Sequence, residues 1–157
     1  MSFDRAFDLV IGSEGGYVND KHDPGGETKY GISKRAYPYI DIKTLTMADA
    51  KRIYKRDYWD RVDGDGLPWP LSFFLFDSAV NQGIHTAVVL MQKSLNLKQD
   101  GILGPETLSA IWNSTVDELG PTYMADRAMR YAETFQFKTY GRGWLRRLFK
   151  AMMEVNE

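Results

Sequence analysis

The sequence contains no cysteine, and this absence removes several chemistries at once. Without thiols the chain has no disulfide scaffold, no thiolate zinc site, no iron–sulfur cluster and no cysteine nucleophile. A cysteine-free chain tolerates oxidising and reducing surroundings alike, so the absence says little about its compartment. With 157 residues, 43% of them hydrophobic and 26% charged, the chain can build its own core and is not disordered throughout.

A surplus of one charge and long apolar runs are also lacking. The 20 basic and 21 acidic side chains nearly balance, so we expect no nucleic-acid partner. The longest unbroken apolar run, from Ala87 to Met91, is too short to cross a bilayer. Because no basic segment followed by an apolar one opens the sequence, we expect no secretory signal peptide.

What the sequence does contain is helical periodicity. The segment 71–82 is apolar on nearly every side, which predicts a buried central helix. Pro105 and Pro121 each suit the first position of a helix, whereas residues 15–31 are dense in turn-forming residues. The sequence therefore predicts an α-class fold with a small irregular or β element near residues 15–45. The expected helices span about residues 3–12, 47–58, 71–82, 86–95, 105–113, 121–136 and 143–155.

A carboxyl group follows the apolar stripe of the first helix. Glu14 comes seven residues after Phe7, near the helix face that also carries Val10 and Ile11. Partial burial and the negative end of the helix dipole both disfavour a charged carboxylate, so they predict a raised pKa for Glu14. A carboxylic acid that is still protonated near neutral pH suits the general acid of a glycosidase.

A second carboxyl group lies nearby in a different setting. Asp23 opens an Asp-Pro-Gly-Gly turn, where we expect it to stay solvated and ionised. Two carboxyl groups with different environments are typical of glycoside hydrolysis, and the Thr28 hydroxyl could help to hold an attacking water. Spacing alone leaves open the alternative that Glu14 is a solvated helix end and Asp23 an ordinary turn residue.

A family resemblance favours catalysis. Glu-Gly-Gly-Tyr at 14–17, Asp-Pro-Gly-Gly at 23–26, Thr28 and Gly-Ile at 31–32 resemble the start of the glycoside hydrolase family 108 muramidases. These are lysozyme-like peptidoglycan hydrolases found widely as phage endolysins. The match continues through residues 58–59 and 76–83, and residues 91–108 resemble an accompanying peptidoglycan-binding region.

Near residue 92 the sequence changes from bulky aromatic content to a shorter-helix style, which indicates a soft boundary. We expect a lysozyme-like catalytic region at 1–91 and a helical peptidoglycan-binding-like region at 92–157, packed as one globule. The resemblance implies cleavage of the β-1,4 bond between N-acetylmuramic acid and N-acetylglucosamine. The family's catalytic glutamate carries over to Glu14. The more distant phage lysozymes add an Asp and a Thr; Asp23 matches their spacing, whereas Thr28 comes one residue early. With that carry-over, Asp23 and Thr28 position a water for an inverting reaction.

The resemblance also implies a setting. An endolysin is made in the host cytoplasm without a signal peptide and acts on the cell wall after release through a membrane lesion. A prophage remnant or a secreted effector would have a similar sequence. Two alternatives in function stay open, a lytic transglycosylase that leaves 1,6-anhydro ends and a non-catalytic cell-wall-binding module.

Several other residues are candidates for weaker roles. Asp77 lies on the apolar central helix, and we expect it to have a structural role. We also expect the protein to be a monomer. His22 and His85 are too few and too far apart to predict a metal site, and the chemistry requires no cofactor. The candidate substrate-binding side chains are Tyr17, Tyr30, Asn81 and Gln82.

The C-terminal segment is basic and amphipathic. We expect its apolar face to dock on the core, with weak contact to an anionic membrane as a secondary role. The apolar face is predicted to carry Leu145, Leu148, Phe149 and Met152. The basic face is predicted to carry Arg146, Arg147 and Lys150.

Overall fold

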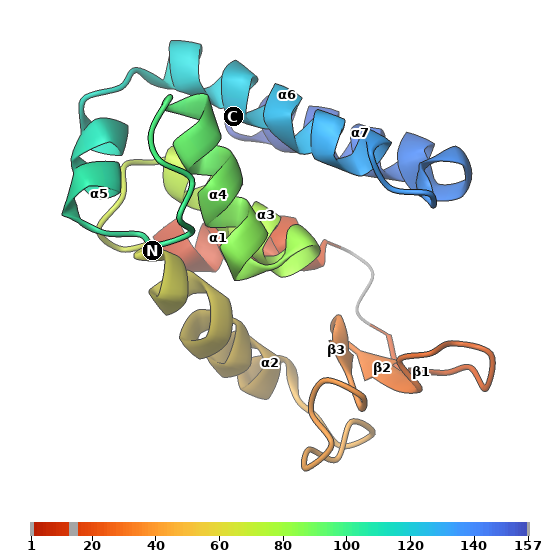
Figure 1. Ribbon diagram of the computed structural model, residues 1–157. Coiled ribbons are helices and arrows are strands. Elements are labelled where there is room, and N and C mark those ends of the chain that lie inside the picture. The colour runs from red at the N-terminus through yellow and green to blue at the C-terminus, as the bar shows by residue number, and fades with distance from the viewer. Residues whose placement is uncertain (1, 13–15, 157) are drawn as a thin grey trace.

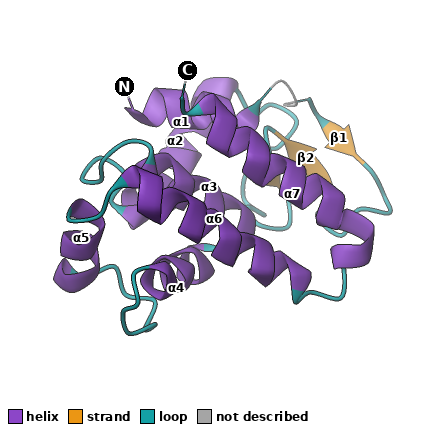
Figure 2. Ribbon diagram, turned by 90° about the horizontal axis from the view of Figure 1, so that it is seen from above, coloured by secondary structure: helices purple, strands orange, loops and turns teal. Residues whose placement is uncertain are grey.

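Helix α3 (Leu71–Gln82) runs through the middle of the molecule, with other helices packed around it (Figures 1 and 2). Residues 71–79 are all buried, because their apolar side chains point in every direction and leave no face for solvent. The prediction of a buried central helix is confirmed.

The structure is a computed structural model that describes residues 2–12 and 16–156. These two ranges contain seven α-helices and one three-stranded antiparallel sheet, which confirms the predicted α class with a small β element. The α-helices are α1 (Ser2–Ile11), α2 (Met47–Tyr54), α3, α4 (Ile84–Ser94), α5 (Pro105–Trp112), α6 (Val116–Ala132) and α7 (Phe137–Glu154). The strands are β1 (Val18–Asn19), β2 (Glu27–Lys29) and β3 (Ile32–Ser33).

Helix α2 begins with a capping box in which Thr46 and Asp49 satisfy each other's backbone N–H groups. The α-helix ends at Tyr54, earlier than predicted, and continues as a π-helical turn (Lys55–Trp59) and a 3₁₀ turn (Asp60–Val62). The wider turn places the Trp59 ring in the core, where its Nε1 donates to Asp65 Oδ1 at 2.9 Å.

Helix α6 begins at Val116, so the prediction that Pro121 opens it is wrong. A proline inside a helix forfeits one backbone hydrogen bond. Burial offsets that loss, because Leu119 and Gly120 pack into the core before the proline. At Gly120 a Cβ would lie only 3.3 Å from the Phe74 ring of α3, so the two helices approach closely there.

Helix α7 docks on the core, as predicted, although it begins earlier, and Leu145, Leu148 and Met152 pack against the core as expected. Leu148 and Ala151 are buried, whereas Phe149 is 69% exposed, so its predicted place on the docked face is wrong. Arg147, predicted to be solvated, instead turns inward and pairs with a buried carboxylate of α3. The docked face therefore departs from the predicted one at Phe149 and Arg147.

The sheet lies to one side of the helices in Figure 1. Strand β2 pairs with both β1 and β3, and Tyr30 and Gly31 form the two-residue turn between β2 and β3. Both turn residues have positive φ, of 52° and 74°, as the hairpin turn that matches strand twist requires. Ile32 is buried and ties the sheet to the core.

The predicted boundary at residue 92 falls inside α4, which packs on α3 and α6. The division into regions 1–91 and 92–157 stays a prediction. No helix in the two described ranges is long and apolar enough to cross a membrane.

Candidate active site

The predicted general acid, Glu14, lies outside the described residues. The helix that leads to it is as expected, since Phe7 and Ile11 are buried on one stripe and Val10 is half-buried. Helix α1 ends at Ile11 and is followed by Gly12, whose φ of 60° stops the helix and whose N–H donates to Asp8 O at 2.9 Å. The chain then leaves α1 toward Glu14.

Asp23 lies in an exposed turn, as the sequence predicts. Its Oδ1 accepts a hydrogen bond from Gly25 N at 2.8 Å, and its carbonyl accepts one from Gly26 N at 3.0 Å. An Asp side chain that accepts from the backbone two residues on is a common way to fix a turn. Within residues 2–12 and 16–156 its other carboxylate oxygen accepts no hydrogen bond, and the residue is exposed to solvent.

Thr28 is connected to the same turn. It lies in the middle of β2, opposite Val18 on one side and Ser33 on the other. Its hydroxyl donates to Gly26 O at 3.4 Å. Gly26 therefore links the two predicted water-positioning residues, because its N–H binds Asp23 and its carbonyl accepts from Thr28.

The hairpin that carries Tyr30 is tethered to α2. The Tyr54 hydroxyl donates to Tyr30 O at 3.0 Å, and burial raises the pKa of Tyr54 to about 12, which keeps it a donor. A Cβ at Gly31 would collide with the same hydroxyl, so glycine is required for the approach as well as for its φ. The Tyr30 ring is half-buried beneath Lys29 Nζ, which lies 5.4 Å from its centroid.

Tyr17 has a partner that sequence reasoning missed. Its hydroxyl donates to Glu27 Oε1 at 2.6 Å, and this hydrogen bond raises the pKa of Tyr17. Glu27 adds a half-buried carboxyl group to the sheet. The Tyr17–Glu27 contact follows from the strand register. Glu27 pairs with Asn19, and Asn19 comes two residues after Tyr17. That register cannot be read before the hairpin is known.

The two amide candidates on α3 both contact α6. Asn81 is exposed, and its Oδ1 accepts a hydrogen bond from the Tyr131 hydroxyl. Gln82 Oε1 accepts from Arg127 Nε at 2.9 Å and from Ser78 Oγ at 3.2 Å. Gln82 thus helps to orient a buried arginine, while the predicted substrate contacts of both residues stay predictions.

Asp77 joins three helices, and its expected structural role is confirmed. Its Oδ2 accepts from Arg127 Nη2 of α6 at 2.8 Å, and its Oδ1 accepts from Arg147 Nη2 of α7 at 2.6 Å. Asp77 and Arg127 are fully buried. Burial opposes ionisation of Asp77, but the two guanidinium groups outweigh it and hold its pKa below the usual range.

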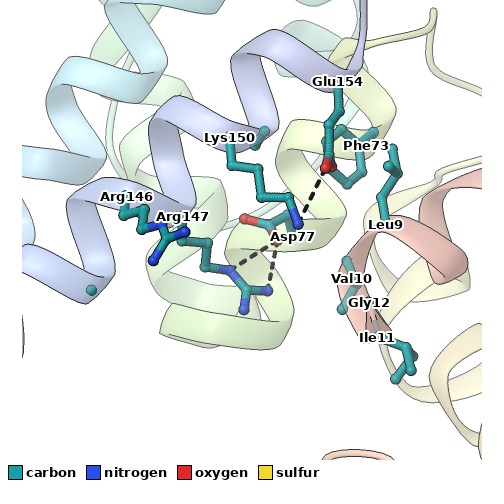
Figure 3. Close-up of a pocket in the computed structure, with 12 residues that line it drawn as sticks. Leu9, Val10, Ile11, Gly12, Phe73, Asp77, Arg146, Arg147, Lys150 and Glu154 are labelled. Atoms are coloured by element: carbon teal, nitrogen blue, oxygen red, sulfur yellow. Dashed lines mark hydrogen bonds and ion pairs between the residues drawn. The ribbon is translucent and has the colours of Figure 1, made fainter. Parts of the chain in front are cut away.

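A pocket of about 340 Å³ opens between α1, α3 and α7 (Figure 3). Residues 9–12, at the end of α1, form one wall, so the pocket borders the point where the chain departs toward Glu14. In Figure 3 the side chains of Arg147 and Lys150 reach from α7 toward α3. Arg146 also lines the pocket, which makes its α7 side strongly basic.

The described ranges 2–12 and 16–156 contain no group of three or more His, Cys, Asp or Glu side chains that could hold a metal ion. The Asp23 turn and strand β2 place an exposed carboxylate and the Thr28 hydroxyl in the segment that follows Glu14, linked through the backbone of Gly26. A carboxylate accepts hydrogen bonds and a hydroxyl both donates and accepts them, so each side chain can bind water.

Comparison with known proteins agrees with this architecture. Residues 7–83 match the sequence model described as Glycosyl hydrolase 108, and residues 75–111 match that of a peptidoglycan binding domain. The chain is similar to the solved structure of SagA from Brucella abortus, with a TM-score of 0.88 and 31% identity. That similarity covers 98% of this chain and 93% of the other. No curated protein matches the chain.

Proposed function

This chain belongs to the glycosyl hydrolase 108 family of lysozyme-like glycoside hydrolases, and on that premise we propose that it cleaves the β-1,4 bond between N-acetylmuramic acid and N-acetylglucosamine in peptidoglycan. One observation carries the proposal: the same chain matches a glycoside hydrolase across residues 7–83 and a peptidoglycan binding domain across residues 75–111. A hydrolase joined to a binding region for one polymer is expected to act on that polymer.

In the proposed mechanism, Glu14 donates its proton to the glycosidic oxygen as the bond breaks. Asp23 accepts a proton from a water that Thr28 helps to hold, and the water attacks the anomeric carbon from the opposite face. Such an inverting reaction requires carboxyl groups about 6.5–9.5 Å apart, whereas a retaining one requires about 5–5.5 Å. The exposed position of Asp23 and its connection to Thr28 through Gly26 support this assignment.

The sugar rings are proposed to contact the two tyrosines of the sheet and the two amides at the end of α3. Tyr17 is 38% exposed and can stack on a ring while its hydroxyl stays bonded to Glu27. Asn81 and Gln82 lie at the C-terminal end of α3, and their amide groups suit sugar hydroxyls and N-acetyl groups.

The main competing reaction is that of a lytic transglycosylase. It needs the general acid but no attacking water, so Asp23 and Thr28 favour hydrolysis over it. Mass spectrometry of digested peptidoglycan separates the outcomes. We expect products with reducing ends. Products with 1,6-anhydro ends would contradict hydrolysis, and no products at all would leave only a wall-binding role.

We further propose that the protein acts as an endolysin, as a monomer that is made in the cytoplasm and reaches the wall through a lesion made by another protein. Expression inside a Gram-negative cell should cause lysis only when a pore-forming protein is expressed with it. Lysis by the protein alone would contradict this dependence on release.

A secondary contact with anionic membrane is proposed for the exposed part of the basic helix face. Arg146 and Lys150 are exposed, although Lys150 also pairs with Glu154, whereas Arg147 is directed inward to Asp77. Co-sedimentation with anionic vesicles at low and high salt tests this contact, and added salt should weaken it.

A further inference from the structure

The pocket between α1, α3 and α7 carries a surplus of positive charge. Its lining includes Arg146, Arg147 and Lys150 from α7, together with the carboxylates of Asp77 and Glu154. Asp77 pairs with both the fully buried Arg127 and Arg147, so among the described residues two guanidinium groups share one carboxylate and a positive surplus remains.

The remaining groups do not remove this surplus. Glu154 Oε1 lies 3.3 Å from Lys150 Nζ and balances only that cation. The guanidinium of Arg146 makes no hydrogen bond or ion pair with the residues that the structure describes. The end of α1 contributes roughly −0.5 elementary charge, which is smaller than the surplus that Arg146 and Arg147 leave within the described part of the chain.

The arginine side chain nearest the interior is held in place. Arg147 Nε and Nη2 both bond to Asp77 Oδ1, at 3.1 and 2.6 Å, and the side chain is still 31% exposed. A guanidinium fixed on one edge keeps its other N–H groups available, and a planar fork of donors suits a carboxylate. The Lys150–Glu154 pair shows that the pocket already accommodates a carboxylate from the chain itself.

We propose that this pocket binds a carboxylate of the peptide stem of peptidoglycan, and so selects stem-bearing glycan over uncharged glycan. The inference rests on the proposed function, because it treats the pocket as an extension of the peptidoglycan site. Two features support the assignment. The pocket borders the end of α1 that leads to Glu14, and its volume of about 340 Å³ fits a peptide side chain with its carboxylate.

A fragment with one sugar tests the proposal without any bond for the enzyme to cut. The probe is N-acetylmuramoyl-L-alanyl-D-glutamate, and its diamide, which has the same shape without carboxylates, is the matched ligand. Binding is measured by calorimetry or by NMR titration of the wild-type protein. We expect the diamide to bind about tenfold more weakly, the scale of one hydrogen bond to a charged group. Equal affinities would overturn the proposal.

Variants locate the binding to the pocket. Arg146→Gln should weaken binding of the acidic fragment about tenfold and leave binding of the diamide unchanged. Glu154→Gln should instead strengthen it, because a competing carboxylate is removed. The control is Arg142→Gln, which removes the same charge from an exposed position of α7 outside the pocket and should change the affinity little. If Arg142→Gln and Arg146→Gln lose equal affinity for the acidic fragment, the attraction depends on the net charge of the protein, and the assignment to this pocket is overturned.

Two further probes distinguish the sources of an anion. Free N-acetylmuramic acid offers the lactyl carboxylate without a stem, and anionic phospholipid vesicles offer phosphate. Binding of either with the same dependence on Arg146, and no binding of the stem-bearing fragment, would overturn the assignment to the peptide stem.

The failure of this proposal differs from failure of the proposed function. A protein that releases no products from peptidoglycan but binds the acidic fragment through Arg146 would refute hydrolysis alone. A protein that releases reducing ends but binds fragment and diamide equally would refute the pocket assignment alone.

Discussion

The sheet segment (residues 16–45) and the buried cluster of Asp77, Arg127 and Arg147 use polar side chains in opposite ways. In the sheet segment, Asp23 and Thr28 each bond to backbone atoms only two residues away. In the buried cluster, Asp77 bonds to partners 50 and 70 residues away. The sheet segment holds its polar groups at the surface with local bonds, which leaves them free for substrate. In the buried cluster the Asp77 carboxylate is engaged on both oxygens in holding three helices together.

The largest expected effect tests the buried cluster. Asp77→Asn leaves two arginines without their counter-charge, so we expect the free energy of unfolding to fall by about 3–5 kcal/mol. Chemical denaturation measures the change. Asp60→Asn is the control, because its ion pair with Lys55 is at the surface and should contribute at most about 1 kcal/mol. Similar losses of unfolding free energy in Asp77→Asn and Asp60→Asn would contradict a special stabilising role for the buried cluster.

The same cluster gives a pH dependence with a definite sign. Because the pKa of Asp77 is lowered in the folded state, its contribution is present above the unfolded value of about 3.9 and is lost as the pH falls below it. Wild-type stability should therefore decline below about pH 4 more steeply than that of Asp77→Asn.

The next effect tests which face of α7 is docked. Leu148→Ala should lower the free energy of unfolding by about 2–5 kcal/mol, since the side chain is 4% exposed. Phe149→Ala, the neighbouring residue at 69% exposure, should change it by no more than about 0.5 kcal/mol. Thermal or denaturant unfolding of the two single variants measures the contrast. A larger loss of unfolding free energy in Phe149→Ala than in Leu148→Ala would place Phe149 on the docked face, as periodicity predicted.

For catalysis, we expect Glu14→Gln to reduce wall lysis at least ~10²-fold, the usual scale of general acid catalysis. The change removes a proton and preserves size, so the unfolding curve should be unaltered. Glu133→Gln, at an exposed position, is the matched control. Lysis near the wild-type level by a folded Glu14→Gln protein would refute its assignment as the acid.

Asp23 tests whether a turn residue is also a catalytic one. Asp23→Asn keeps an oxygen that can accept from Gly25 N but removes the charge, whereas Asp23→Ala removes both. If the carboxylate activates water, both variants should lose activity by about 10-fold or more while still binding wall fragments. Full activity in Asp23→Asn with loss only in Asp23→Ala would limit Asp23 to shaping the turn.

The stereochemistry of the product is a second test of whether Asp23 acts as the base of an inverting reaction. NMR of the first-formed product should show the α anomer from the β-linked substrate. A β anomer would mean retention, and would exclude Asp23 as the base of an inverting reaction.

The smallest effect concerns the tether between the sheet and α2. Tyr54→Phe removes the hydrogen bond to Tyr30 O and should lower stability by about 0.5–1.5 kcal/mol. Hydrogen exchange at the hairpin should increase with it. Tyr39→Phe, at a residue that is 99% exposed, should change neither quantity.

Much of the fold could be predicted because its cause is local. The apolar residues on all sides of α3 required burial wherever the rest of the chain went, and the Thr46 capping box and the Asp23 turn each depend on residues within three positions. Among the site residues, the exposure of Asp23 followed from its turn. The roles of Glu14, Asp23 and Thr28 remain predictions.

Only the tertiary structure decided the contacts between segments that are far apart in the sequence. Pro121 inside α6 and Arg147 turned toward Asp77 both depend on what neighbouring helices bury. The Tyr17–Glu27 pair depends on strand register, and the basic pocket depends on where α7 meets α1. The sequence by itself determined that these segments are helical, that α3 is buried and that Asp23 lies in a turn, since these follow from neighbouring residues. The partners of its charges were decided by packing, because burial and Coulomb attraction act between groups that only the folded chain brings together.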